Sequence, residues 1–255
     1  MLENKFIECE RAYYRNFCET TIDNSVIRFR DPLLKGMYDH NFTEVVDGKV
    51  TPEFFQTEIK IRQNEGEKFC KVQTYNGLSA DVLEKVDLPK EREYLGFYLM
   101  DLNKLSSWKD SPEKIEVKIV KNEMQLQQII DIELDGETSQ EYIDFVPLKE
   151  KRRSLVYFAD EGIDAFVAYQ GNEPTGHIQL FVHNKVAKIE DFKIVESHRG
   201  KGLGTTLLKY VMDLALSQGV DSIHLNADEE DTAKEMYMKL GFEKIGQLES
   251  VRFTL

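Results

Sequence analysis

The chain has 255 residues, of which 41% are hydrophobic, so it is long enough to bury one large core or two modest ones. Its 46 acidic and 33 basic residues give a formal net charge of -13. This charge argues against a nucleic-acid binder, because a phosphate backbone attracts clustered Lys and Arg. Residues 115–255 carry a balance of -9 and residues 1–114 one of -4, so any charged substrate of the later part is expected to be a cation.

The cysteines and the apolar runs indicate in which cellular compartment the protein is expected. Cys9, Cys18 and Cys70 are an odd number without metal-ligand spacing, so we expect reduced thiols and no metal site. The longest apolar runs are too short to span a bilayer, and the N-terminus is charged from its third residue, unlike a signal peptide. We therefore expect a cytoplasmic protein without a membrane partner, either a monomer or a homodimer.

A polar stretch at 103–113 is the predicted linker between an N-terminal domain (1–102) and a C-terminal domain (114–255). The apolar spacing after it predicts an α/β fold with a mixed sheet that begins as an antiparallel meander. In chain order, the expected elements are a strand at 114–120, a helix at 123–134, a helix at 139–158 interrupted near Pro147, strands at 164–170, 176–183 and 185–195, a helix at 203–219, a strand at 222–227, a helix at 231–241 and two closing strands at 242–246 and 249–255.

The first 102 residues form a smaller α+β domain by the same criteria. When the chain is aligned with itself at an offset of 153 residues, this segment shows a weak similarity to the C-terminal half. Gly66 then aligns with Gly219, Val72 with Leu225 and Ala80 with Ala233. Two interpretations remain open: a degenerate copy of the C-terminal half, or an unrelated α+β domain. In neither case does the segment carry a glycine loop of its own.

The stretch "SHRGKGLGTTLLKY" (197–210) places three alternate glycines between a predicted strand and a predicted helix. A P-loop would need Ser or Thr after Lys201, where Gly202 stands, and a dinucleotide fingerprint would need Gly at Thr205. Glycines let backbone N–H groups approach a diphosphate, and a helix that begins near Leu203 directs its positive end at it. A ligand-free turn is the remaining alternative.

Arg199-Gly200-Lys201-Gly202-Leu203-Gly204 resembles R/Q-x-x-G-x-G/A, the acyl-CoA pyrophosphate loop of the GNAT family of acetyltransferases. "AKEMYMKLGFEKIG" further on is similar to the family's A-x-x-L-Y-x-K-x-G-F signature, and the order of elements agrees from 114 to 255. Two positions depart from the family pattern: Glu196 stands in place of a common Pro, and Glu230 in place of a frequent Asn. The resemblance implies the GNAT fold, with a central mixed sheet, splayed strands and flanking helices.

The same resemblance implies a set of site residues. Tyr237 corresponds to the family's Tyr, the proton donor to the departing thiolate, and the backbone near Ile194 polarises the thioester. The expected cofactor contacts are Phe192, Ile194, Arg199, Gly200, Lys201, Gly202, Leu203, Gly204, Thr205 and Asn226.

The acceptor side is less sharply defined. Glu190 and Asp191 resemble a segment that contacts the amine, and because strand side chains alternate, we expect only one of them to face the site. Glu190 shares the parity of Phe192 and is the preferred general base. Tyr142 and Phe145 are candidate substrate contacts, whereas His224 is expected to be structural.

The resemblance implies transfer of an acetyl group from acetyl-CoA to a primary amine by direct attack of the amine on the thioester. Cationic amines are included among the expected acceptors. The alternative is a catalytically idle acyl-CoA-binding or protein-interaction module, in which the N-terminal part blocks the amine site.

Overall fold

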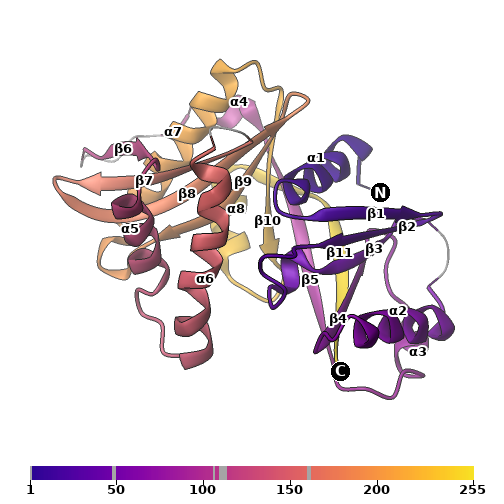
Figure 1. Ribbon diagram of the computed structural model, residues 1–255. Helices are drawn as coiled ribbons and strands as arrows, with labels where there is room; N and C mark the ends of the chain where they lie inside the picture. Colours follow the sequence, from indigo (N-terminus) through magenta and orange to yellow (C-terminus); the bar gives the residue numbers. More distant parts are fainter. Residues whose placement is uncertain (1, 48–49, 106, 109–113, 160–161) are drawn as a thin grey trace.

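The computed structural model describes residues 2–47, 50–105, 107–108, 114–159 and 162–255. In these residues, one continuous sheet of eleven strands has the order β1-β2-β3-β4-β11-β5-β10-β9-β8-β7-β6 (Figure 1). The N-terminal elements are α1 (Asn4–Arg15), β1 (Glu19–Asp23), β2 (Val26–Arg30), η1 (Tyr38–His40), β3 (Phe42–Val45), α2 (Pro52–Asn64), β4 (Phe69–Thr74), α3 (Ala80–Leu83), β5 (Lys90–Met100) and α4 (Leu102–Leu105).

The C-terminal elements follow the predicted order. They are β6 (Glu116–Ile119), α5 (Glu123–Glu133), α6 (Gln140–Tyr157), β7 (Ile163–Gln170), β8 (Glu173–His183), β9 (Val186–Ile194), η2 (Glu196–His198), α7 (Leu203–Ser217), β10 (Ser222–Asp228), α8 (Ala233–Leu240) and β11 (Phe242–Thr254). The meander β7-β8-β9 is antiparallel, and β9 and β10 are parallel, which confirms the mixed α/β fold. No described helix combines the length and the apolar character that crossing a membrane requires.

Several local expectations differ from the structure. Helix α6 runs through Pro147 without a break, because its buried residues, such as Val146 and Arg153, hold both halves of the helix against neighbouring elements. The C-terminal end forms one long strand, β11, instead of two. Of the predicted linker 103–113, the structure describes 103–105, which belong to α4, and 107–108, while 106 and 109–113 lie outside the described residues.

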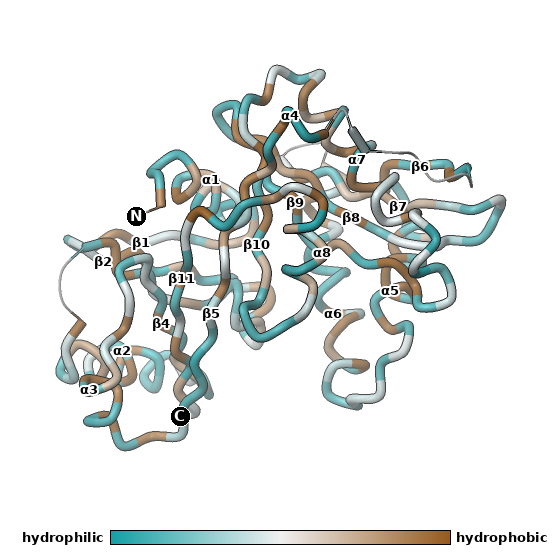
Figure 2. The backbone as a smooth tube through the Cα atoms, turned by 180° about the vertical axis from the view of Figure 1, so that it is seen from behind, coloured by the Kyte–Doolittle hydropathy of each residue, from teal (hydrophilic) through white to brown (hydrophobic). Residues whose placement is uncertain are grey.

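The two predicted closing segments form one strand because β11 pairs with β5 of the N-terminal half from Phe242 to Phe253. Strand β5, from the N-terminal half, lies between β10 and β11, and β11 in turn lies between β5 and β4 (Figures 1 and 2). The pairing registers repeat with the offset of 153 found in the sequence: Thr74 is opposite Glu249, and Gly96 is opposite Ala227. The weak internal sequence similarity therefore corresponds to a repeated arrangement of strands.

Helix α1 covers the C-terminal half of the sheet although it begins the chain. Its Phe6 packs edge-on against His224 of β10, and its Cys9 thiol contacts the backbone carbonyl of Val186 in β9. The fully buried Glu10 accepts hydrogen bonds from Lys188 at 2.6 Å and from His224 at 3.0 Å. One hydrophobic cluster consequently joins residues of both halves, from Leu2 to Leu248.

The contacts of Glu10 predict a pH dependence of stability. Burial would raise the pKa of Glu10, but the Lys188 ammonium and the bond from His224 outweigh it and lower the pKa from 4.5 to about 2. A carboxyl with a lowered pKa in the folded protein stabilises it above pH 4.5, and this stability is lost as the pH falls toward 2. From pH 6 to pH 2.5, wild type should lose about 2–3 kcal/mol more than Glu10→Gln, measured by urea denaturation. Equal losses of unfolding free energy in wild type and variant would contradict this role of Glu10. In the variant, the buried Lys188 still has Glu190 as an ion-pair partner.

Candidate active site

The glycine loop forms a bare helix N-terminus. Gly200 and Gly202 have φ angles of 73° and 81°, in the left-handed region that glycine adopts without strain. Gly202 is the N-cap of α7 and offers no side chain to bond the first-turn N–H groups, which have no partner within the helix itself. The Arg199 guanidinium donates to the carbonyl of Ile194 at 2.9 Å and ties the loop to β9. This geometry suits a bound anion.

Gly204 brings the first turn of α7 against β9. A Cβ at this position would lie 3.1 Å from the ring of Phe192 and 3.4 Å from the side chain of Ile194. The structure therefore gathers the predicted loop residues, Arg199 to Thr205, beside the two predicted contacts on β9.

Strands β9 and β10 diverge next to this loop. They pair only from Val186 to Ile189 and from Ser222 to Leu225, although β9 continues to Ile194 and β10 to Asp228. The backbone N–H of Val195, just after β9, donates to the carbonyl of Thr175 in β8 at 3.0 Å. Because antiparallel ladders alternate, the N–H and C=O of Ile194 point away from β8, toward the gap between β9 and β10.

A β-bulge in β9 corrects the expectation that only one of Glu190 and Asp191 faces the site. The register shifts between His177 and Gln179 of β8, where β9 has one extra residue, and Asp191 has a φ of 47°. A bulge interrupts the alternation of side chains. Both Glu190 and Asp191 accordingly line the same cavity.

This cavity has a volume of about 870 Å³ and lies between the two halves of the chain. The C-terminal half contributes predicted residues to its lining, namely Tyr142, Phe145, Glu190, Asp191 and Asn226. The N-terminal half contributes residues that no sequence motif singled out, namely Tyr13, Tyr14, Gly36, Met37, Tyr38, Asp39, His40, Glu91, Glu93 and Leu95. The cavity wall is therefore composite.

A network of buried charges holds the cavity wall. Arg153 of α6 forms an ion pair with Asp191, and Lys149, one turn earlier, lies 3.1 Å from Glu133 of α5. Glu133 also accepts hydrogen bonds from Tyr142 at 2.9 Å and from His177 at 2.6 Å. Burial opposes ionisation of Glu133, but the bond with His177 and the nearby charges lower its pKa overall. Lys149 and Arg153 are spaced i, i+4, which places both cations on the same face of α6.

Tyr237 lies on α8 and is mostly buried. Its ring packs edge-on against Phe242 at 5.8 Å between centroids, as a core tyrosine would. Burial, and secondarily the Glu190 carboxylate, raises the pKa of Tyr237 to about 12, so the phenol is protonated at neutral pH and can donate a proton. Tyr237 is not one of the described residues that line the cavity.

Two further positions have structural roles. His224 is fully buried, bonded to Glu10 and stacked on Phe97, which agrees with the structural role expected for it. The N-cap of α8 is Thr232, and the helix begins at Ala233, two residues later than the sequence pattern predicted.

Comparison with known proteins identifies the C-terminal half. Residues 126–242 match a family model described as "Acetyltransferase (GNAT) family". The uncharacterized N-acetyltransferase CgeE of Bacillus subtilis (strain 168) is 34% identical over 108 residues, which cover 40% of this chain and 41% of that protein. The match thus spans less than half of the relative's length.

Solved structures resemble the whole chain in fold. A functionally unknown conserved protein from Staphylococcus epidermidis ATCC 12228 superposes with a TM-score of 0.80 at 19% identity, over 93% of this chain and 94% of its own. A GCN5-related N-acetyltransferase from Kribbella flavida gives 0.71 at 14% identity, over 98% and 94%. A tandem GNAT protein from the clavulanic acid biosynthesis pathway gives 0.58 at 12% identity, over 96% and 87%. Residues 126–242, just under half of the chain, are thus similar to the GNAT family of acetyltransferases.

Proposed function

We propose that this chain transfers an acetyl group from acetyl-CoA to a primary amine. One observation carries the proposal: the bare N-terminus of α7, the gap between β9 and β10 and the large cavity are adjoining parts of one site. The helix end suits a diphosphate, the gap suits the pantetheine arm, and the cavity suits an acceptor. Acetyl transfer in general is the activity named for the matched family.

The cofactor contacts belong to the C-terminal half alone. Backbone N–H groups from Gly200 to Thr205 hold the pyrophosphate, and Arg199 and Lys201 add positive charge. In the N-terminal half, the corresponding helix α2 has a side-chain cap from Thr51 and an acidic residue, Glu53, in its first turn. Both features disfavour an anion, so we infer a single acetyl-CoA site.

The chemistry follows from the groups around the gap. The amine nitrogen attacks the thioester carbon while the N–H of Ile194 stabilises the developing negative charge on the carbonyl oxygen. The C–S bond breaks, and Tyr237 gives its proton to the departing thiolate. Glu190, which lines the cavity, accepts a proton from the amine nitrogen, directly or through water. Tyr237 is then reprotonated from solvent.

The acceptor is a cation before it loses its proton. Among the described residues that line the cavity, eight are acidic and four are Lys or Arg: Asp39, Glu91, Glu93, Glu133, Glu141, Glu190, Asp191 and Asp228 against Lys149, Arg153, Lys188 and Arg252. An excess of carboxylates in a hollow site attracts cations and disfavours acidic substrates.

Substitution at Gly202 should test the loop. An alanine with a φ of 81° costs about 1–2 kcal/mol, so Gly202→Ala should raise the acetyl-CoA dissociation constant about tenfold. Gly171→Ala is the matched control, because Gly171 has a φ of 63° in the turn between β7 and β8, and a Cβ added there would have no neighbouring heavy atom within 4 Å. Isothermal titration should show normal acetyl-CoA binding for Gly171→Ala. Equal affinities for the two variants would contradict the loop assignment.

The overall proposal is tested by thermal denaturation with and without acetyl-CoA, followed by thiol release over an amine panel. Acetyl-CoA at 100 times its dissociation constant should raise the Tm by about 5 °C or more. Thiol release with an amine then establishes transfer. The N-terminal half lines the cavity, which is the observation favouring an idle binding module. Stabilisation without turnover on any amine would favour that module, and absence of stabilisation would refute both.

A further inference from the structure

His40, at the end of η1, is a fully buried side chain that lines the acceptor cavity. Its Nδ1 lies 2.9 Å from Oδ2 of Asp31, itself fully buried. Arg152 of α6 donates through Nε to both oxygens of Asp31, at 2.9 and 3.0 Å. This Asp31–His40 pair therefore joins the N-terminal half to the helix that carries the charged wall of the cavity.

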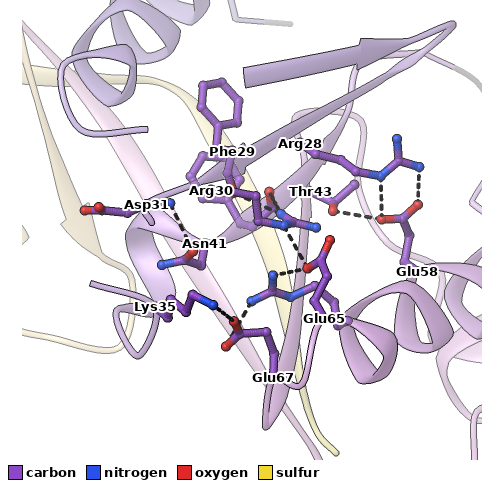
Figure 3. A network of polar contacts seen from close by, with 12 residues as sticks. Arg28, Phe29, Arg30, Asp31, Lys35, Asn41, Thr43, Glu58, Glu65 and Glu67 are labelled. Carbon is purple, nitrogen blue, oxygen red and sulfur yellow. Dashed lines mark hydrogen bonds and ion pairs between the residues drawn. The ribbon is translucent and has the colours of Figure 1, made fainter. Parts of the chain in front are cut away.

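The segment that carries the pair is held in place by its own hydrogen bonds. The side-chain oxygen of Asn41 accepts the backbone N–H of Asp31 at 3.1 Å (Figure 3). The amide nitrogen of Asn41 donates to the carbonyls of Leu34 and Met37, and the ring of His40 stacks on Phe17 at 4.4 Å. The orientation of the imidazole is thus fixed by the hydrogen bonds of its backbone segment, by stacking on Phe17 and by the hydrogen bond with Asp31.

The hydrogen bond with Asp31 selects one tautomer. Burial lowers the pKa of His40, with Asp31 opposing the effect and the Arg153 charge adding to it, so the ring is neutral at pH 7. Arg152 and Leu33 N–H hold Asp31 as an acceptor, so His40 donates Nδ1–H and keeps a lone pair on Nε2. Nε2 is buried and has no hydrogen-bond partner among the described residues. A buried acceptor without a donor is costly unless a ligand or water fills the position.

We propose that Nε2 of His40 accepts a hydrogen bond from the acceptor substrate, from a donor group remote from the reacting nitrogen. The inference rests on the proposed function. The reacting nitrogen lies at the gap between β9 and β10, whereas His40 belongs to the N-terminal wall of the same cavity. The acceptor class is therefore a small amine with a second N–H or O–H donor, such as a diamine or an amino alcohol.

Matched amines test the inference by kinetics. Wild type should use 1,4-diaminobutane or 4-amino-1-butanol with a kcat/KM about tenfold or more above that of n-butylamine, because n-butylamine leaves Nε2 unpaired. His40→Phe keeps a ring to stack on Phe17 and removes both nitrogens. This variant should bring the ratio of kcat/KM for a donor-bearing amine to kcat/KM for n-butylamine close to 1, mainly through a higher KM for the donor-bearing amines. A ratio that persists in His40→Phe would overturn the inference, and the relative effects of the two probes distinguish an ammonium from a hydroxyl donor.

A second measurement does not depend on turnover. With ε1-¹³C-labelled histidine, the resonance missing from His40→Phe assigns His40, and the other four histidines serve as internal controls. Adding 1,4-diaminobutane or 4-amino-1-butanol should shift the His40 resonance of wild type, and n-butylamine should shift it less. A shift in a protein that acetylates no amine would support the binding role while the proposed function fails. Turnover without any selective shift would refute the role of His40 alone, and absence of both would refute the two proposals together.

Discussion

Tyr237→Phe should lower kcat about 10²-fold or more and change the acetyl-CoA dissociation constant less than about twofold. The pKa of Tyr237 is about 12, so the phenol is protonated across the working range and can transfer its proton to the thiolate. Phenylalanine keeps the edge-on packing against Phe242 and removes only the hydroxyl. Thiol release at saturating amine gives kcat, and isothermal titration gives the binding constant.

Tyr210→Phe is the control for this experiment. Tyr210 is an exposed tyrosine of α7 that packs edge-on against Phe166, away from the cavity. Its loss should leave kcat and acetyl-CoA binding unchanged. If Tyr237→Phe also retained the wild-type kcat, the hydroxyl would have no catalytic role, and Tyr237 would be a packing residue.

The C-terminal fold and the glycine loop were predictable because their signals are local. Alternation of apolar residues predicted β7, β8 and β9, and the spacing of Gly200, Gly202 and Gly204 predicted a bare helix start that the structure contains. Each of these features depends on residues that are neighbours in the sequence.

The acceptor side was less predictable, because its geometry depends on deviations from regular patterns. Alternation assigned Glu190 and Asp191 to opposite faces, but the bulge at Asp191 brings both into the cavity. A non-glycine residue in the left-handed region leaves no clear mark in a single sequence. Pro147 produced the opposite error, because packing of α6 overrides a local helix breaker.

The N-terminal wall was not predictable from the sequence at all. Asp31 and His40 are separated from Arg152 by more than a hundred residues, and only the folded sheet brings them together. The exchange of β5 and β11 has the same character: the offset of 153 indicated a repeat, but not which half would receive each strand. Long-range pairing of this kind requires the tertiary structure.

The segment 114–255, expressed alone, should fail to form a stable monomeric domain despite containing the matched family region. Without β5, strand β10 loses its partners from Leu95 to Leu99, and β11 loses both neighbours, since its other neighbour, β4, is also absent. Unpaired strand edges promote aggregation. Removal of α1 also exposes the apolar face of β9 and β10 and takes Glu10 away from the buried Lys188.

Co-expression separates this cause from a general loss of solubility. Residues 1–102 and 103–255, produced as two chains in one cell, should assemble into a complex that acetyl-CoA stabilises, because every strand pairing can then form again. Light scattering, near-ultraviolet circular dichroism and the acetyl-CoA shift in Tm distinguish the assembled complex from the isolated segment. A monodisperse, acetyl-CoA-stabilised 114–255 fragment would show that β5 and α1 are dispensable. The acetyl-CoA site would then be independent of the N-terminal half, and only the acceptor cavity would need both.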